Sequence, residues 1–204
     1  MSGVERLGEL PLFALQRPPQ ERGDAARNRA LLLQAARSLV AEHGADAVTM
    51  DDIAAAAGVG KGTVFRRFGS RAGLMMVLLD EDEKTMQQAF MFGPPPLGPD
   101  APPLDRLLAF GRARLRFVHT HSELLSAANR DPASRYGAPA MVQHTHIRML
   151  LASAGTSGDL DGQTDALAAL LEADYVEYQL TERGRTLQTL GDAWESLARK
   201  LCGR

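Results

Sequence analysis

The sequence predicts an all-α protein with two parts, a small N-terminal three-helix domain and a larger C-terminal helical domain. Apolar residues recur at spacings of three and four along most of the chain, which is the period of an amphipathic helix. No stretch alternates apolar and polar residues over six positions, as a half-buried strand would. A segment rich in proline and glycine, residues 93–103, is the clearest break between helical stretches.

Charge is distributed unevenly along the 204 residues, although the net formal charge is only −2 and the apolar fraction of 45% is ordinary for a globular protein. Residues 23–73 carry seven Lys and Arg against five Asp and Glu, whereas residues 74–204 carry 13 against 17. A basic N-terminal part followed by an acidic C-terminal part favours a polyanionic partner that binds at the N-terminal end.

Cysteine usage and hydropathy favour a cytoplasmic protein. Cys202 is the only cysteine, so the chain forms no internal disulfide, which is consistent with a reducing compartment. The longest apolar run, Leu74–Leu79, is too short to cross a bilayer, and the N-terminus lacks the pattern of a secretory signal. We therefore expect no membrane association.

Four helices are expected in the first half of the chain, after a mostly disordered arm over residues 1–22 that contains three prolines. Their expected bounds are 24–43, 50–57, 61–68 and 71–92. Thr49 is the expected N-cap of the second helix, Gly58 supplies the positive φ that ends it, and Ser70 caps the fourth.

The second and third helices, joined by a glycine turn and supported by the first, form a predicted helix-turn-helix over residues 23–73. Apolar positions are spaced to give it a small core, made of Ile53, Ala54, Val59, Val64 and Phe68. The residues left facing outward are Lys61, Gly62, Thr63, Phe65, Arg66 and Arg67. Lys and Arg neutralise phosphates, Arg also grips guanine, Thr bonds phosphates or base edges, and glycine permits close approach. A solvated basic turn would explain each residue singly, but the whole constellation favours DNA binding.

The segment VTMDDIAAAAGVGKGTVFRRFGSRAGLM, residues 48–75, resembles the DNA-binding region of TetR-type transcriptional regulators, and the similarity covers about residues 25–80. The resemblance implies a homodimer that places one recognition helix per subunit in successive major-groove faces of a near-palindromic operator. It also implies that Thr49 and Arg71 hold phosphates at helix starts, while Lys61, Gly62 and Thr63 lie along the groove.

Three positions depart from the family pattern. Phe65 stands where tyrosine is usual, so a hydroxyl–phosphate bond is missing. Gly60 stands where serine is frequent, which weakens a helix cap and its phosphate contact. Arg67 stands where histidine is common, and we expect its charge to restore part of the lost affinity.

The second half of the chain has helical stretches expected over residues 104–121, 122–130, 139–154, 162–182 and 185–201. Helical projection places Arg114 within the apolar arc of the first stretch and Asp174 within that of the fourth. Because burying an unpaired arginine is expensive, two alternatives arise. Arg114 and Asp174 form a structural ion pair, or Arg114 is a polar anchor in a ligand cavity.

In the cavity alternative, two arginines and two histidines supply polar groups among apolar and aromatic side chains. The candidate ligand-binding residues are Phe110, Arg114, Phe117, His121, Met141, His144, Arg148, Asp174 and Tyr178. The ligand expected from them is a small to medium-sized, partly apolar effector with an acidic or carbonyl group.

Metal and catalytic chemistry find little support in the sequence. The pairs His119/His121 and His144/His146 are two residues apart, about 200° around a helix, so neither pair shares one ion. No nucleophile motif and no glycine-rich phosphate loop after a strand is present, so we expect neither an enzyme nor a cofactor.

The last helical stretch carries an apolar stripe of Leu187, Leu190, Trp194, Leu197 and Leu201. With the preceding helix it suits a four-helix bundle between two subunits, although a core helix of a monomer would show the same stripe. The function expected is a ligand-responsive transcriptional regulator, a repressor released from its operator by a small molecule. The alternative is a constitutive DNA-binding regulator that has a filled core and no effector.

Overall fold

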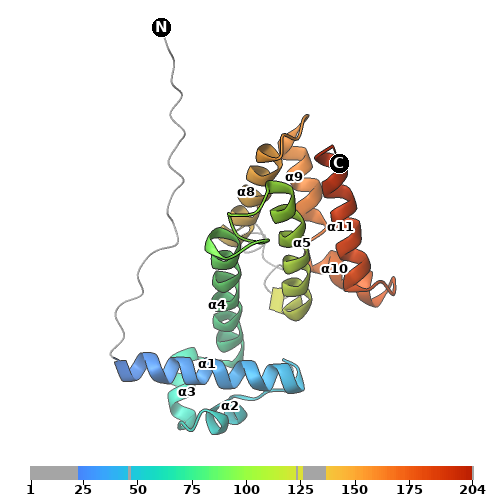
Figure 1. The fold of residues 1–204 in the computed structure, drawn as a ribbon. Coiled ribbons are helices and arrows are strands. Elements are labelled where there is room, and N and C mark those ends of the chain that lie inside the picture. Colours follow the sequence, from blue (N-terminus) through green and yellow to red (C-terminus); the bar gives the residue numbers. More distant parts are fainter. Residues whose placement is uncertain (1–22, 46, 123, 126–136, 204) are drawn as a thin grey trace. The chain divides into compact units, whose positions relative to one another are not determined.

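The computed structural model describes residues 23–45, 47–122, 124–125 and 137–203, and it assigns no strand to any of them. Figure 1 shows helices throughout these ranges, which confirms the all-α prediction. The chain divides into two compact units, residues 1–67 and 68–204. The arm expected over residues 1–22 and most of the helix expected over 122–130 lie outside the described residues.

The first unit contains α1 (Gly23–His43), α2 (Met50–Ala56) and nearly all of α3 (Lys61–Phe68). Its fully or almost fully buried side chains are those of Leu32, Leu33, Ala36, Val48, Met50, Ile53, Ala54 and Val64. Apart from Val48, which lies in the loop before α2, these residues come from all three helices. The short α2 and α3 are therefore stabilised by shared apolar burial rather than by their own helix propensity.

Local signals fix the bounds of α2. The Thr49 hydroxyl accepts a hydrogen bond from the Asp52 backbone N–H at 3.2 Å, and the Asp52 carboxylate accepts one from the Thr49 N–H at 3.0 Å. This capping box satisfies two donors at the helix start. At the other end Gly58 has φ of 67°, a left-handed conformation that glycine adopts without strain. The Thr49 cap and the Gly58 turn are therefore confirmed.

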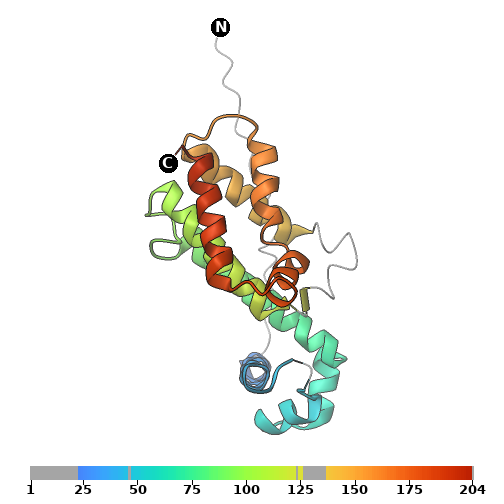
Figure 2. The ribbon, with the colours of Figure 1, turned by 90° about the vertical axis from the view of Figure 1, so that its right-hand side faces the viewer.

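The second unit begins with α4 (Arg71–Phe92), and the Ser70 hydroxyl caps it as predicted by accepting from the Gly73 N–H at 3.1 Å. The remaining helices are α5 (Pro103–Thr120), α8 (Ala138–Ser153), α9 (Leu160–Ala169), α10 (Ala173–Thr181) and α11 (Leu187–Leu201). Helix α5 packs against α8, α10 and α11, while α9 packs against α8 and α11, and Figures 1 and 2 show this helical bundle from two sides.

The single helix predicted over residues 162–182 is wrong, because the chain breaks there into α9 and α10. The last turn of α9 tightens, with the Leu170 and Leu171 N–H groups bonding three residues back, and Glu172 then adopts an extended ψ of 137°. The break allows α10 to pack against α5 while Leu167, Leu171 and Val176 all remain buried. No glycine or proline marks it, so tertiary packing overrides the local helical pattern.

The apolar stripe of α11 lies inside the subunit. Trp194 is fully buried, and its indole N–H donates to the carbonyl of Leu107 in α5 at 3.1 Å. Leu190 and Ala198 are buried on the same face. The stripe is therefore a core face, and the expectation that it serves self-association is corrected.

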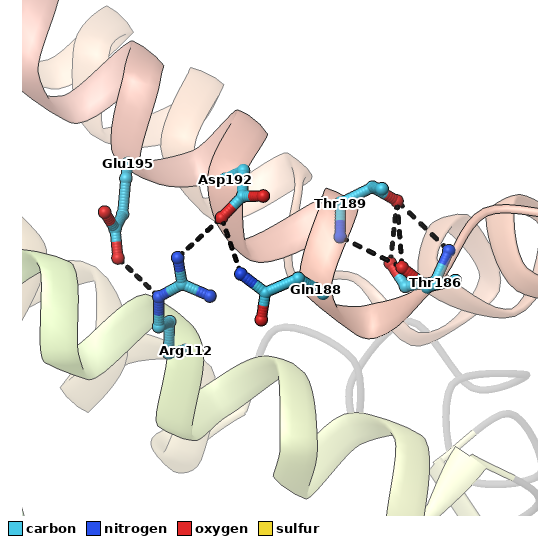
Figure 3. Close-up of polar contacts among 6 residues, drawn as sticks. All are labelled: Arg112, Thr186, Gln188, Thr189, Asp192 and Glu195. Carbon is cyan, nitrogen blue, oxygen red and sulfur yellow. Dashed lines mark hydrogen bonds and ion pairs between the residues drawn. The ribbon is translucent and has the colours of Figure 1, made fainter.

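Polar contacts flank this core face (Figure 3). Arg112 of α5 donates to the carboxylates of Glu195 and Asp192 on α11, the latter at 2.7 Å. These two carboxylates raise the pKa of Arg112, with Glu195 contributing most. At the start of α11 the hydroxyl of Thr186 accepts from the Thr189 N–H at 3.2 Å, which begins the helix at Leu187 rather than at residue 185.

Candidate DNA-binding surface and ligand cavity

Helix α3 has one buried apolar side and one polar side. Val64 is fully buried, while Lys61, Gly62, Phe65 and Arg66 are exposed. Thr63 and Arg67 are half-buried. Helix α3 therefore presents cations, an aromatic ring and a glycine together, and burial of Val64 fixes which face is turned outward.

Two of the predicted DNA-contacting side chains are held by acidic residues at the start of α2. The ammonium of Lys61 lies 2.7 Å from Oδ2 of Asp51, and the Thr49 hydroxyl donates to Oδ2 of Asp52 at 2.6 Å. The hydrogen bonds from Thr49 hold the pKa of Asp52 below its usual value. Both pairs are exposed, so water screens them and a phosphate can replace the carboxylate at small cost.

Phe65 and Arg71 complete the predicted surface. The Phe65 ring is exposed and lies 5.8 Å from the Lys61 ammonium, so it stacks near a cation rather than filling a core. Arg71 is the first residue of α4, after the Ser70 cap, and is half-buried.

The second unit contains a cavity of about 340 Å³, which is within the range of small-molecule sites. Most of its lining is apolar and includes Met76, Leu79, Val118, Ala140, Ala168 and Leu171. The ionisable lining residues are Asp80 and Glu83 of α4, Arg114 of α5, His144 of α8 and Glu172 before α10.

Arg114 is buried as predicted, but its partner is Glu83 rather than Asp174. Its Nη1 donates to Oε2 of Glu83 at 2.5 Å, and each residue exposes only 6% of its surface. The guanidinium carbon also lies 4.5 Å from the centroid of the Phe117 ring. Asp174 is exposed because the break before α10 changes the helical phase on which its predicted inward position depended.

The other predicted ligand residues lie at several separate positions in the second unit. His144 lines the cavity, and its Nδ1 lies 3.4 Å from Asp165. His121 stacks on Phe117 and contacts Asp82 of α4 at 3.0 Å. Phe110 is fully buried in the core.

The remaining three predicted residues lie on the outside of the unit. Met141 and Tyr178 are exposed, and Arg148 pairs with Asp161 at 2.6 Å. Of the nine predicted ligand residues, the cavity therefore brings together Arg114 and His144.

Sequence reasoning missed Glu83, although a signal for it exists. Leu79, Glu83, Met86 and Phe90 follow one another at spacings of four, three and four along α4, and all four are buried. A carboxylate within such a stripe requires a buried cation as its partner. Arg114, whose partner was left open by the sequence, supplies it.

His146 of α8 is a buried titratable side chain in the core of the second unit. Its ring lies 4.3 Å from that of Phe90 and 5.0 Å from that of Phe110, and its Nε2 has no hydrogen-bond partner. Burial, with a smaller contribution from the charge of Arg106, lowers the pKa of His146 to about 4. The imidazole is therefore neutral at pH 7.

Two negative findings concern the part of the chain that the structure describes. No group of three or more His, Cys, Asp or Glu side chains there is arranged to hold a metal ion. None of the helices there is both long and apolar enough to span a bilayer.

Comparison with known proteins agrees with this architecture. Residues 32–76 match the family model of bacterial regulatory proteins of the tetR family. A search of curated proteins gave no match.

Solved structures of similar fold match over most of the chain. A protein from Saccharomonospora viridis, described as a transcriptional regulator and solved with choline, has a TM-score of 0.66 at 20% identity, covering 84% of this chain and 95% of its own. A TetR-family regulator from Pectobacterium atrosepticum gives 0.63 at 22% identity, covering 88% and 96%. A complex of SmeT with triclosan gives 0.59 at 16% identity, covering 85% and 90%. At these identities the similarity shows the fold.

Proposed function

We propose that this chain, whose residues 32–76 match the tetR family of bacterial regulatory proteins, binds an operator as a homodimer and is released by a small molecule. The observation that carries the proposal is the exposed basic face of α3. This helix follows a capped α2 and a glycine turn, buries Val64, and exposes Lys61, Phe65 and Arg66 on one surface. Such a helix fits the major groove, where lysine and arginine contact phosphates and bases.

Ligand release is supported by the cavity. Helix α4 follows α3 in the chain after only Gly69 and Ser70, and it contributes Asp80 and Glu83 to the cavity wall. A ligand that favours one position of α4 changes the spacing of the two recognition helices, which must match about one helical turn of DNA, roughly 34–36 Å. The ligand acts only if it binds the two states with different affinity.

Two proteins of similar fold were solved with small molecules, one with choline and the other with triclosan, which supports a small-molecule ligand for this chain. The alternative function, a constitutive regulator without an effector, requires a filled core. A cavity of about 340 Å³ with a largely apolar lining favours the ligand-responsive function over that alternative.

The homodimer is proposed through the outward faces of the last two helices rather than through the buried stripe of α11. On the side of α11 away from Trp194, Thr189 and Ser196 are exposed, and both are small enough to permit close packing of a second helix. The protein acts in the cytoplasm, where the operator lies.

Selection from a random duplex library with the purified protein tests the function. We expect a near-palindromic sequence to be enriched and the Arg66→Ala variant to bind it at least tenfold more weakly, because each subunit loses a cation from α3. Arg116→Ala is the matched control, since it removes an exposed arginine from α5 in the second unit. Enrichment of no sequence, or equal losses in both variants, would contradict DNA binding by α3.

A further inference from the structure

The cavity in the second unit combines paired charges in its wall with an arginine whose N–H donors are only partly used. We propose that its ligand is an uncharged molecule with a small apolar body and a carbonyl oxygen, and that Arg114 holds this oxygen by hydrogen bonds from Nε and Nη2. This inference rests on the proposed function in one respect, namely that the cavity is the effector site. Of the acidic and carbonyl groups expected from the sequence, only the carbonyl fits.

The charged groups in the cavity wall have partners. Glu83 is paired with Arg114, with Oε2 and Nη1 lying 2.5 Å apart, and Asp80 is paired with Lys84 at 2.6 Å. Glu172, the third carboxylate in the wall, is also engaged in an interaction. A charged ligand therefore meets no uncompensated opposite charge among these groups.

This pairing disfavours ligands of either charge. His144, the remaining ionisable side chain of the wall, lies 3.4 Å from Asp165. An anion beside Arg114 would also lie beside Glu83, with which it would share the guanidinium, and each of these two residues exposes only 6% of its surface. Moving a further charge from water into such a site costs more than a shared partner compensates. A neutral ligand avoids this cost.

Arg114 has N–H donors that the described residues leave unused. Its hydrogen bonds to these residues leave from Nη1, to Glu83 and, at 3.9 Å, to the sulfur of Met86. Its Nε is buried without a hydrogen-bond partner. In a planar guanidinium the Nε–H and one N–H of Nη2 point in the same direction, so one oxygen can accept from both. Because a buried donor without a partner is unfavourable, a ligand carbonyl at this edge stabilises the site.

The apolar lining sets the body of the ligand. Leu79 of α4, Val118 of α5 and Leu171 after α9 line the cavity together with Arg114. The volume of about 340 Å³ lies at the lower end for ligand sites, so the body is a single ring or a short alkyl chain. Because Arg114 belongs to α5 and its partner Glu83 to α4, an oxygen bound to Arg114 acts at the contact between these helices.

Calorimetric titration of the full-length protein with four probes that share a phenyl ring tests the ligand class. Acetophenone carries the carbonyl, and α-methylstyrene has a methylene group in place of its oxygen. Benzoate carries a negative charge and 1-phenylethylammonium a positive one. We expect acetophenone to bind about tenfold more tightly than α-methylstyrene, because it gains hydrogen bonds from a charged donor, and both ions to bind more weakly than acetophenone. Tightest binding by either ion, equal binding of acetophenone and α-methylstyrene, or no binding of acetophenone would overturn the proposal.

A matched pair of alanine substitutions on α8 locates the site. Ala140 lines the cavity, whereas Ala152 is exposed and lies outside the lining. Ala140→Phe adds a ring at the cavity wall, and we expect it to weaken acetophenone binding by about tenfold through overpacking. Ala152→Phe adds the same ring elsewhere on the same helix and should bind acetophenone as the wild type does. Equal affinities in the two variants would overturn the assignment of the ligand to this cavity.

The doubly substituted Glu83→Met, Arg114→Met variant removes the guanidinium donors without leaving one buried charge alone. With folding verified by circular dichroism, we expect this variant to bind acetophenone and α-methylstyrene with similar affinity. A preference for acetophenone as large as that of the wild type would contradict the role of Arg114.

Operator binding is measured separately in each protein. Probe binding in the expected order without an effect on operator affinity would support the ligand class while contradicting ligand release. Release of the operator by one of the ions and not by acetophenone would contradict the ligand class and leave ligand release intact.

Discussion

At the scale of single residues, His146 shows how the core sets the charge of a side chain. Its ring packs against both Phe90 and Phe110, and the residue exposes 6% of its surface. Its pKa of about 4 lies well below the ordinary 6.5. Because the unfolded chain takes up this proton at a higher pH than the folded chain does, acid favours unfolding. The stability that neutral His146 contributes is present above pH 6.5 and is lost as the pH falls toward 4.

The resulting prediction is a pH-dependent free energy of unfolding. Lowering the pH from 7 to 5 should reduce the free energy of unfolding by about 2 kcal/mol through His146 alone, a value that follows from linkage between the two pKa values. The measurement is urea denaturation at both pH values for the wild type and for His146→Phe, which removes the titrating group. The difference between pH 7 and pH 5 should be about 2 kcal/mol smaller in the variant. Identical pH dependence in both proteins would show that His146 is not the source.

At the scale of helices, the contact between α5 and α11 depends on a glycine. A Cβ placed on Gly111 would overlap the ring of Trp194, which is fully buried and held by its bond to Leu107. Neither α5 nor the Trp194 ring of α11 can move aside without disturbing this core. Glycine is therefore retained inside a helix, where it is otherwise unfavourable by about 1 kcal/mol relative to alanine.

Gly111→Ala should lower the free energy of unfolding by about 2 kcal/mol, because overpacking outweighs the gain in helix propensity. Gly191→Ala is the matched control on α11. Its Cβ would meet Nη1 of Arg112 at 2.5 Å, and that atom belongs to a flexible, partly exposed side chain that can move aside. We expect its stability to change by less than about 1 kcal/mol. Urea denaturation of the two variants checks the difference, and equal effects would refute the packing argument.

The helices most fully predictable from sequence are those whose ends carry local signals. Thr49, Gly58 and Ser70 act through their own backbone neighbourhood, so α2 and the start of α4 could be placed from sequence within a residue. The break between α9 and α10 depends on which long-range contacts bury Leu171 and Val176, so no local pattern predicts it.

Whether a feature of the candidate sites could be predicted also depends on whether local or long-range contacts determine it. The outward face of α3 could be predicted because it follows from the helix period and one buried residue, Val64. Burial of Arg114 was likewise predictable, but its partner was not. Pairing with Glu83 depends on how α5 packs on α4, and the predicted inward position of Asp174 is wrong because the helical phase changes at Glu172.

At the scale of the whole molecule, the two parts of the chain have opposite charge. Residues 23–73 carry seven cations against five anions, and residues 74–204 carry 13 against 17. In the proposed homodimer, two basic N-terminal parts would therefore attract DNA and two acidic C-terminal parts would repel it. Affinity should consequently arise from a small number of phosphate contacts in each subunit and should fall steeply with salt.

Lys61 provides a quantitative test of this dimeric arrangement. Its ammonium is held by Asp51 at 2.7 Å in the free protein, and we expect it to exchange this carboxylate for a phosphate on DNA. Lys61→Ala should reduce the slope of log affinity against log salt by about 0.9 for each phosphate that the variant no longer neutralises, hence by about 2 for a dimer. Lys200→Ala removes an exposed lysine from α11 and should leave the slope unchanged. Fluorescence anisotropy over a series of salt concentrations measures both slopes. A reduction of about 1 would indicate a single engaged subunit, and no reduction would exclude Lys61 from the phosphate contacts.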